Sequence, residues 1–187
     1  WEPPDGAARA RERLLNQDSL SSLGRAWHLG GESGCTEAMS VAQQEWIQGD
    51  IGRASQAVRV ALHCDAHSGD ALRLGAKVAN ITGPREWQVQ CLERLLETLS
   101  VEEDRLLIEA DLFWALTRIG DTERAEEIGR ELLLLARKSG HDLIYVDALI
   151  HMANTQIQRG DYQEGRASLE EALSRGKSTR FMARILN

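Results

Sequence analysis

Apolar residues recur every three or four positions along most of the chain, which is the spacing of one face of an α-helix. Ile51, Ala54, Val58 and Ala61 form one such stripe. The pattern predicts helices over residues 35–48, 51–66, 69–81, 85–99, 102–119, 122–138, 142–159 and 162–175. Because the links between them are short, consecutive helices are expected to run antiparallel.

Glycines stand in four of the predicted turns, separated by 34, 37 and 40 residues. They are Gly49, Gly83, Gly120 and Gly160. Aspartate follows three of them, at Asp50, Asp121 and Asp161, and Pro84 follows the fourth. Glycine readily takes the left-handed conformation that ends a helix, and an aspartate side chain accepts from the free N–H groups that begin the next. Proline suits the first position of a helix. These turns therefore predict repeated helical hairpins.

Repetition at this period resembles the tetratricopeptide repeat (TPR), a unit of two antiparallel helices with small residues where they touch. When the turn glycines are aligned with that family, most of its close-packing positions hold alanine or glycine. The twelve positions are Ala42, Ala54, Ala61, Ala76, Gln88, Leu95, Phe113, Ala125, Leu132, Ala153, Gly165 and Ala172. The resemblance implies an all-α fold, a right-handed superhelix of antiparallel hairpins, with four repeats at about 35–67, 68–100, 101–140 and 141–176.

Two features depart from the standard repeat. The proline expected at the repeat end is absent, and the later repeats are longer than 34 residues. Long repeats with Gly-Asp turns look more like the arrays of large bacterial transcriptional regulators of the MalT-like LuxR type. The resemblance therefore implies a module of a multidomain regulatory protein.

The two ends of the chain follow the pattern less closely. Residues 1–30 predict an irregular helical hairpin in which Asp18 caps a helix carrying Leu20, Leu23 and Leu29. The glycine-rich segment 31–34 is predicted to be a hinge loop. Residues 177–187 predict the start of a further or capping helix. Since the chain begins at Trp1 and ends within an apolar helical pattern, we expect a piece of a larger protein.

Composition narrows the class of protein. The chain of 187 residues has 25 Leu and 22 Ala but only 3 Pro, which favours helices, and its few aromatic residues argue against a β-sandwich. The net charge of -7 opposes nucleic-acid binding, and no apolar run approaches the roughly 20 residues that span a bilayer. Cys35, Cys64 and Cys91 cannot all pair and lack a C-x-x-C spacing, so a reducing cytoplasm is the expected location.

No catalytic or cofactor motif is complete. Gly176-Lys177-Ser178-Thr179 resembles the end of a phosphate-binding loop, but Glu171 occupies the position of the required upstream glycine. His63 and His67 lie one helical turn apart and are weak candidates for a metal site, although two ligands do not make one. We therefore expect no enzyme activity, no cofactor and no resident metal.

The groove of such an array is lined by the first helix of each hairpin. The family's groove positions place Trp46, Arg73, Lys77, Asn80, Trp114 and Asn154 on this concave face. The cations and amides suit a carboxylate or a peptide backbone, and the tryptophans suit apolar anchors. The alternative interpretation, which has equal weight, is that the cations are only solvated and that both tryptophans pack against the next hairpin.

The predicted function is binding of a protein or peptide segment through the concave face. Two alternatives are a small-molecule effector sensor and a self-association scaffold, which would be a homodimer in its simplest form.

Overall fold

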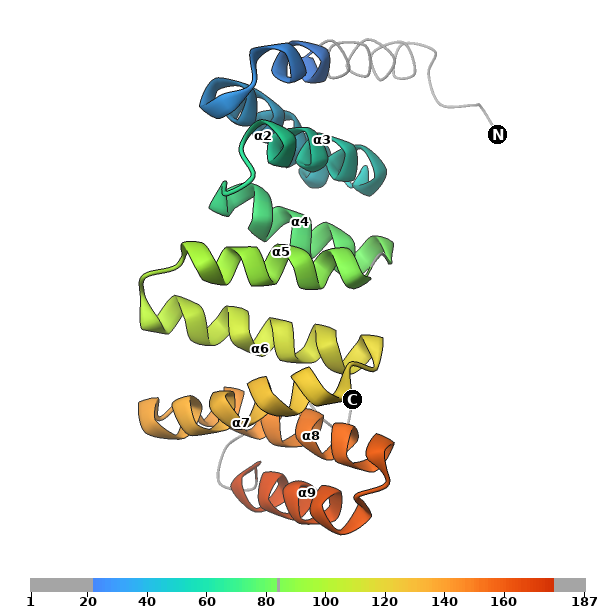
Figure 1. The fold of residues 1–187 in the computed structure, drawn as a ribbon, viewed down its shortest axis with the longest axis vertical. Helices are drawn as coiled ribbons and strands as arrows, with labels where there is room; N and C mark the ends of the chain where they lie inside the picture. Colours follow the sequence, from blue (N-terminus) through green and yellow to red (C-terminus); the bar gives the residue numbers. More distant parts are fainter. Residues whose placement is uncertain (1–21, 84, 177–187) are drawn as a thin grey trace, which may run out of the picture. The chain divides into compact units, whose positions relative to one another are not determined.

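Every regular element that the structure describes is an α-helix. The structure is a computed structural model that describes residues 22–83 and 85–176, and this part of the chain contains no strand. A helix over residues 22–29 is followed by α2 (Gly31–Gln48), α3 (Ile51–Cys64), α4 (Gly69–Thr82), α5 (Arg85–Thr98), α6 (Glu102–Ile119), α7 (Thr122–Ser139), α8 (Asp142–Arg159) and α9 (Tyr162–Gly176) (Figure 1). The predicted all-α class is confirmed.

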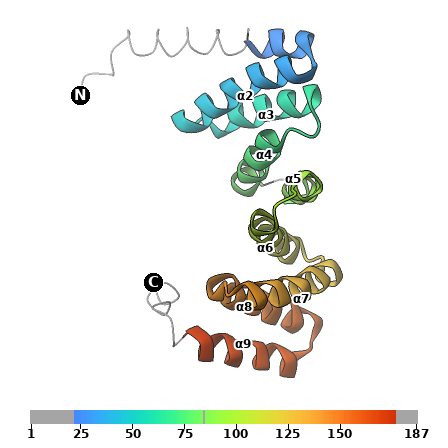
Figure 2. The same ribbon diagram turned by 90° about the vertical axis from the view of Figure 1, so that its left-hand side faces the viewer.

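The chain divides into two compact units, and the division falls inside α5, between Cys91 and Leu92. In the first unit α2 packs against α3 and α3 against α4. In the second unit α6 packs against α7, α7 against α8 and α8 against α9, while α6 also touches α8 (Figure 2). Each unit is thus built from helical hairpins whose neighbours in sequence are neighbours in space.

The predicted turn glycines end their helices as expected. Gly49, Gly83, Gly120 and Gly160 have φ values of 81°, 102°, 79° and 90°, all in the left-handed region that favours glycine. A fifth glycine, Gly140 with φ 73°, ends α7 in the same way. All four predicted turns therefore share a left-handed glycine at the end of the helix, and the division into four repeats stays a prediction.

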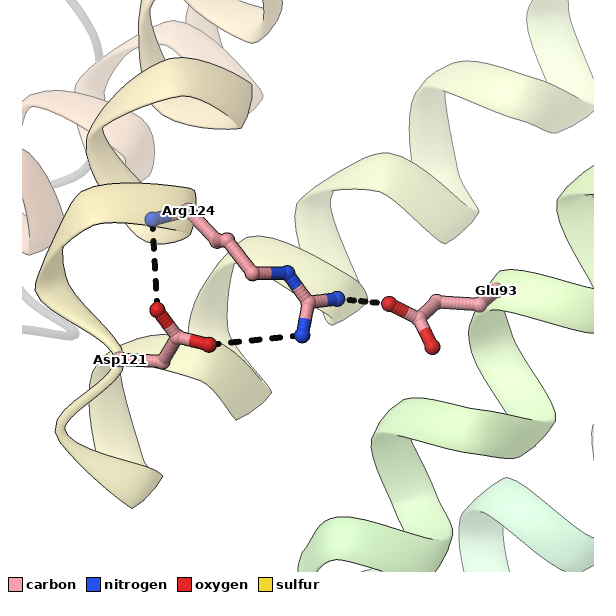
Figure 3. Close-up of polar contacts among 3 residues, drawn as sticks. All are labelled: Glu93, Asp121 and Arg124. Carbon is pink, nitrogen blue, oxygen red and sulfur yellow. Dashed lines mark hydrogen bonds and ion pairs between the residues drawn. The ribbon is translucent and has the colours of Figure 1, made fainter.

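Two of the turn aspartates cap the following helix, and each is joined by an arginine three residues later. The Asp50 carboxylate accepts from the backbone N–H of Arg53 at 3.0 Å, and that of Asp121 accepts from Arg124 at 3.4 Å. Each arginine side chain then pairs with the same aspartate, at 3.3 Å and 3.4 Å. Arg124 also pairs with Glu93 on α5, so this cap ties α7 to a neighbouring helix of its unit (Figure 3).

All twelve positions aligned with the close-packing positions of the TPR are buried. A large residue at such a position can be accommodated only if a neighbouring residue is small. Phe113 on α6 packs against Gly129 on α7, where an added Cβ would lie 2.9 Å from two atoms of the Phe113 ring. Gly165 on α9 follows the pattern directly, because an added Cβ would lie 3.1 Å from the carbonyl oxygen of Ala153 on α8. In this hairpin the small residue is on α7 instead of α6, and the two helices still pack closely.

The prediction of a hinge loop over residues 31–34 is wrong, because these residues form the first turn of α2. The chain bends at Gly30 instead, with φ 61°. Gly34 is buried within the helix, where an added Cβ would lie 2.5 Å from the carbonyl oxygen of Ala26. The glycine at this position serves close packing and not a loop.

Several predictions fall outside the described residues. These are the cap at Asp18, Leu20, the position of Pro84 and the helix over 177–187. Of the predicted N-terminal hairpin, the described part is the helix over 22–29, whose Leu23 packs against the core of the first unit.

Candidate functional site

Arg73 and Lys77 lie one turn apart in the middle of α4, with Asn80 on the same side one turn further. The opposite side of α4 is buried in the core of the first unit. Lys77 is exposed, whereas Arg73 and Asn80 are half-buried. The predicted residues of α4 therefore share one accessible helix face.

The charges of Arg73 and Lys77 are not neutralised within the described part of the chain, since neither forms an ion pair there. By contrast, eight arginines form ion pairs with carboxylates: Arg25, Arg53, Arg105, Arg124, Arg130, Arg159, Arg166 and Arg175. Arg137 and Lys138 also lack an ion pair in the described chain, but they lie in the last turn of α7, where the helix dipole favours a cation. No such local reason accounts for two cations in the middle of α4.

Trp46 of α2 belongs to the same unit and is half-buried. It packs against a buried cluster that includes Leu74 and Val78 of α4. Part of the Trp46 side chain is therefore buried against this core, and the rest is accessible to solvent.

A second predicted surface lies on α6 and α8, which contact each other in the second unit. Trp114 on α6 is half-buried, and the guanidinium of Arg118 lies 4.4 Å from the centroid of its ring. His151 on α8 meets the Trp114 ring edge-on, with centroids 6.2 Å apart, and meets Phe113 in the same way at 5.9 Å. Trp114 therefore contacts the next hairpin, which is the alternative that the sequence left open for the tryptophans.

His151 was not among the predicted residues, although it lies three positions before Asn154, which is exposed. Asp147 lies one turn before His151, with its carboxylate 3.8 Å from the imidazole Nε2. Burial lowers the pKa of His151, and the nearby Asp147 opposes this effect only in part. The imidazole is therefore neutral near pH 7. The spacing of Asp147 and His151 by four residues is the signal that sequence reasoning overlooked.

The two candidate metal ligands do not come together as the sequence predicts. Helix α3 ends at Cys64, so His67 lies beyond it in a turn where its N–H donates to the Asp65 carboxylate at 3.0 Å. His63 stacks on Trp27, with ring centroids 3.9 Å apart. Among the described residues, no three histidine, cysteine or acidic side chains are grouped to hold a metal ion.

The cysteines of the described chain are free thiols. Cys64 donates to the carbonyl oxygen of Ala26 at 3.3 Å, and burial followed by the proximity of Cys35 raises the pKa of its thiol. A protonated thiol with a structural hydrogen bond is a poor nucleophile.

Comparison with known proteins supports the fold. No family model matches the sequence, and no curated protein matches it. Two solved structures of MamA, a TPR-like helical protein, match with a TM-score of 0.61 each. One is 14% identical over 93% of this chain and 89% of its own, and the other is 16% identical over 92% and 82%. This chain has the TPR-like solenoid fold.

None of the described helices combines the length and the apolar character that a bilayer-crossing helix requires.

Proposed function

We propose that this chain is a non-catalytic module that binds an acidic segment of a peptide or protein through the first helices of its hairpins. The fold is one that typically serves as a protein-interaction scaffold. The observation that carries the proposal is the pair Arg73 and Lys77, two cations in the middle of one helix with no ion-pair partner in the described chain.

The geometry of α4 suits a carboxylate. Residues four apart on a helix have Cβ atoms roughly 5 to 6 Å apart, which allows a guanidinium and an ammonium to reach one acidic side chain together. Arg73 supplies the planar, bidentate donor and Lys77 the mobile charge. Trp46, in the same unit, is half-buried and offers a further apolar contact.

The second unit has a candidate surface of its own on α6 and α8. Trp114 is held by Arg118 and His151, so little side-chain entropy is lost when a ligand packs on it. Leu107 of α6 is exposed on the same helix, and Asn154 of α8 is exposed one turn from His151. We expect Asn154→Ala to weaken binding without changing the stability of the fold.

A random-peptide library selected on the purified protein tests the proposal. We expect the selected peptides to be enriched in aspartate and glutamate and to bind less tightly at high ionic strength. Fluorescence anisotropy with the tightest of these peptides then compares variants. Arg73→Glu with Lys77→Glu should weaken binding by at least about tenfold, because two attractive contacts become repulsive.

The matched control is Arg137→Glu with Lys138→Glu. It makes the same change in net charge at two cations that also lack an ion pair in the described chain. Circular dichroism confirms that both variants fold. Equal losses in the two double variants would mean that overall charge and not the α4 face drives binding, and the proposal would be wrong.

The wider context rests on the sequence. We propose a bacterial regulatory protein of the MalT-like LuxR type as the parent, supported by the long repeats with Gly-Asp turns, and a reducing cytoplasm as its location, supported by the free thiols. A thermal-shift screen with metabolites separates this proposal from an effector sensor, because only a sensor would be stabilised by a small molecule.

A further inference from the structure

Helix α9 carries an apolar stripe on a side that does not face α8. Gly165 and Ala172 are buried, whereas Tyr162, Leu169 and Leu173 are 67%, 40% and 46% exposed. The three exposed residues are seven and four positions apart, which places them on one side of the helix. Among the described elements α9 packs chiefly on α8, and both views show the two helices next to each other (Figures 1 and 2).

An exposed ion pair borders this stripe. Arg166 and Glu170 lie along the edge that is farther from Gly165 and Ala172, and their side chains are 75% and 63% exposed, with 2.7 Å between Nε and Oε1. The stripe thus combines apolar residues with one cation and one anion, four positions apart, on a single edge.

We propose that α9 is the contact surface of a homodimer, in which two copies of this helix pair antiparallel about a two-fold axis near Ser168. The proposal is independent of the peptide-binding surface. A two-fold axis perpendicular to both helices brings residues that are equally distant from its centre together, and it keeps one edge of each helix on the same side. Arg166 then faces the partner's Glu170, and Glu170 faces the partner's Arg166.

The same register also matches the apolar residues. Leu169 lies beside the partner's Leu169 close to the axis, and Leu173 lies beside the partner's Tyr162. A single register therefore satisfies both the charges and the apolar side chains, which is the self-complementarity that an isologous interface requires.

The small size of the α9 contact surface determines the affinity that we expect for the dimer. Three apolar residues on each copy are far fewer than the roughly 20 residues per side of a standard interface. We therefore expect a weak dimer, with a dissociation constant in the micromolar range or above, that forms as the protein is concentrated.

Sedimentation equilibrium over a concentration series tests the proposal, and charge exchange identifies the surface. The wild-type mass should rise from monomer towards dimer. Arg166→Glu and Glu170→Arg should each stay monomeric, because each places like charges opposite one another twice in the dimer. An equimolar mixture of these two variants should form a heterodimer, since the acidic edge of one faces the basic edge of the other.

Two more variants complete the test. The double exchange, Arg166→Glu with Glu170→Arg, should restore the homodimer, and Leu169→Ser should weaken it while circular dichroism shows an intact fold. A wild-type protein that is monomeric at every concentration would overturn the proposal. Association that persists unchanged in Arg166→Glu would overturn it too, because another surface would then be responsible.

Discussion

Substitution of Gly129 by alanine tests how the second unit accommodates a phenylalanine at a small-residue position. The new methyl group would lie 2.6 Å from Cε of Met152 and 2.9 Å from Cε2 and Cζ of Phe113. The methionine end can move, but the Phe113 ring is 1% exposed and packed on all sides. Overpacking of this kind costs about 1 to 3 kcal/mol, against about 1 kcal/mol gained when alanine replaces glycine in a helix. We expect Gly129→Ala to lower the free energy of unfolding by up to about 2 kcal/mol.

The reasoning is checked by repeating the substitution in a Phe113→Leu background, which removes the two ring atoms that the methyl group would strike. There, Gly129→Ala should be neutral or stabilising by up to about 1 kcal/mol. Urea unfolding followed by circular dichroism gives both differences. Gly52→Ala is the matched control, because the nearest atom to its added Cβ is 3.6 Å away. An equal cost of Gly129→Ala in both backgrounds would refute the proposed compensation between Phe113 and Gly129.

Three further predictions concern a cap and two titrating groups. Asp121→Ala should cost about 1 kcal/mol of stability in urea unfolding and Asp121→Asn much less, because asparagine also caps. Burial lowers the pKa of His151, so the unfolded chain binds its proton more readily and stability should fall as the pH drops below about 6.5; His151→Gln should flatten this part of the thermal-melting profile. Burial raises the pKa of Glu109, whose Oε2 lacks a hydrogen-bond partner in the described chain, so Glu109→Gln should raise the melting temperature near neutral pH. That gain should disappear below about pH 4.5, where the carboxyl is neutral in both states; a gain that persists there would point to packing instead.

The helices and their turns could be predicted closely from local sequence. The predicted 102–119, 142–159 and 162–175 agree with α6, α8 and α9 to within one residue. Helix caps and left-handed turns depend on a few neighbouring residues, so Gly120 and Asp121 are enough to predict the end of α6 and the start of α7. Prediction failed at residues 31–34, where the glycines that suggested a loop lie in a helix and Gly34 makes room for another segment.

The candidate residues illustrate a different limit. Sequence spacing placed Arg73 and Lys77 on one helix face, but it could not show that most arginines have carboxylate or aromatic partners while these two cations have no ion pair in the described chain. The contact of His151 with Trp114 joins residues 37 positions apart and has no counterpart in local patterning.

The sequence by itself determined the all-α class, the places where helices end and the small residues that let hairpins close, because each of these depends on backbone preferences and side-chain size within a short stretch. Tertiary structure alone decided which charges form ion pairs in the described chain, which apolar residues of α9 are exposed and how Gly129 accommodates Phe113. These outcomes depend on contacts between side chains of different helices, where several partners compete for each side chain and only the packed fold selects among them.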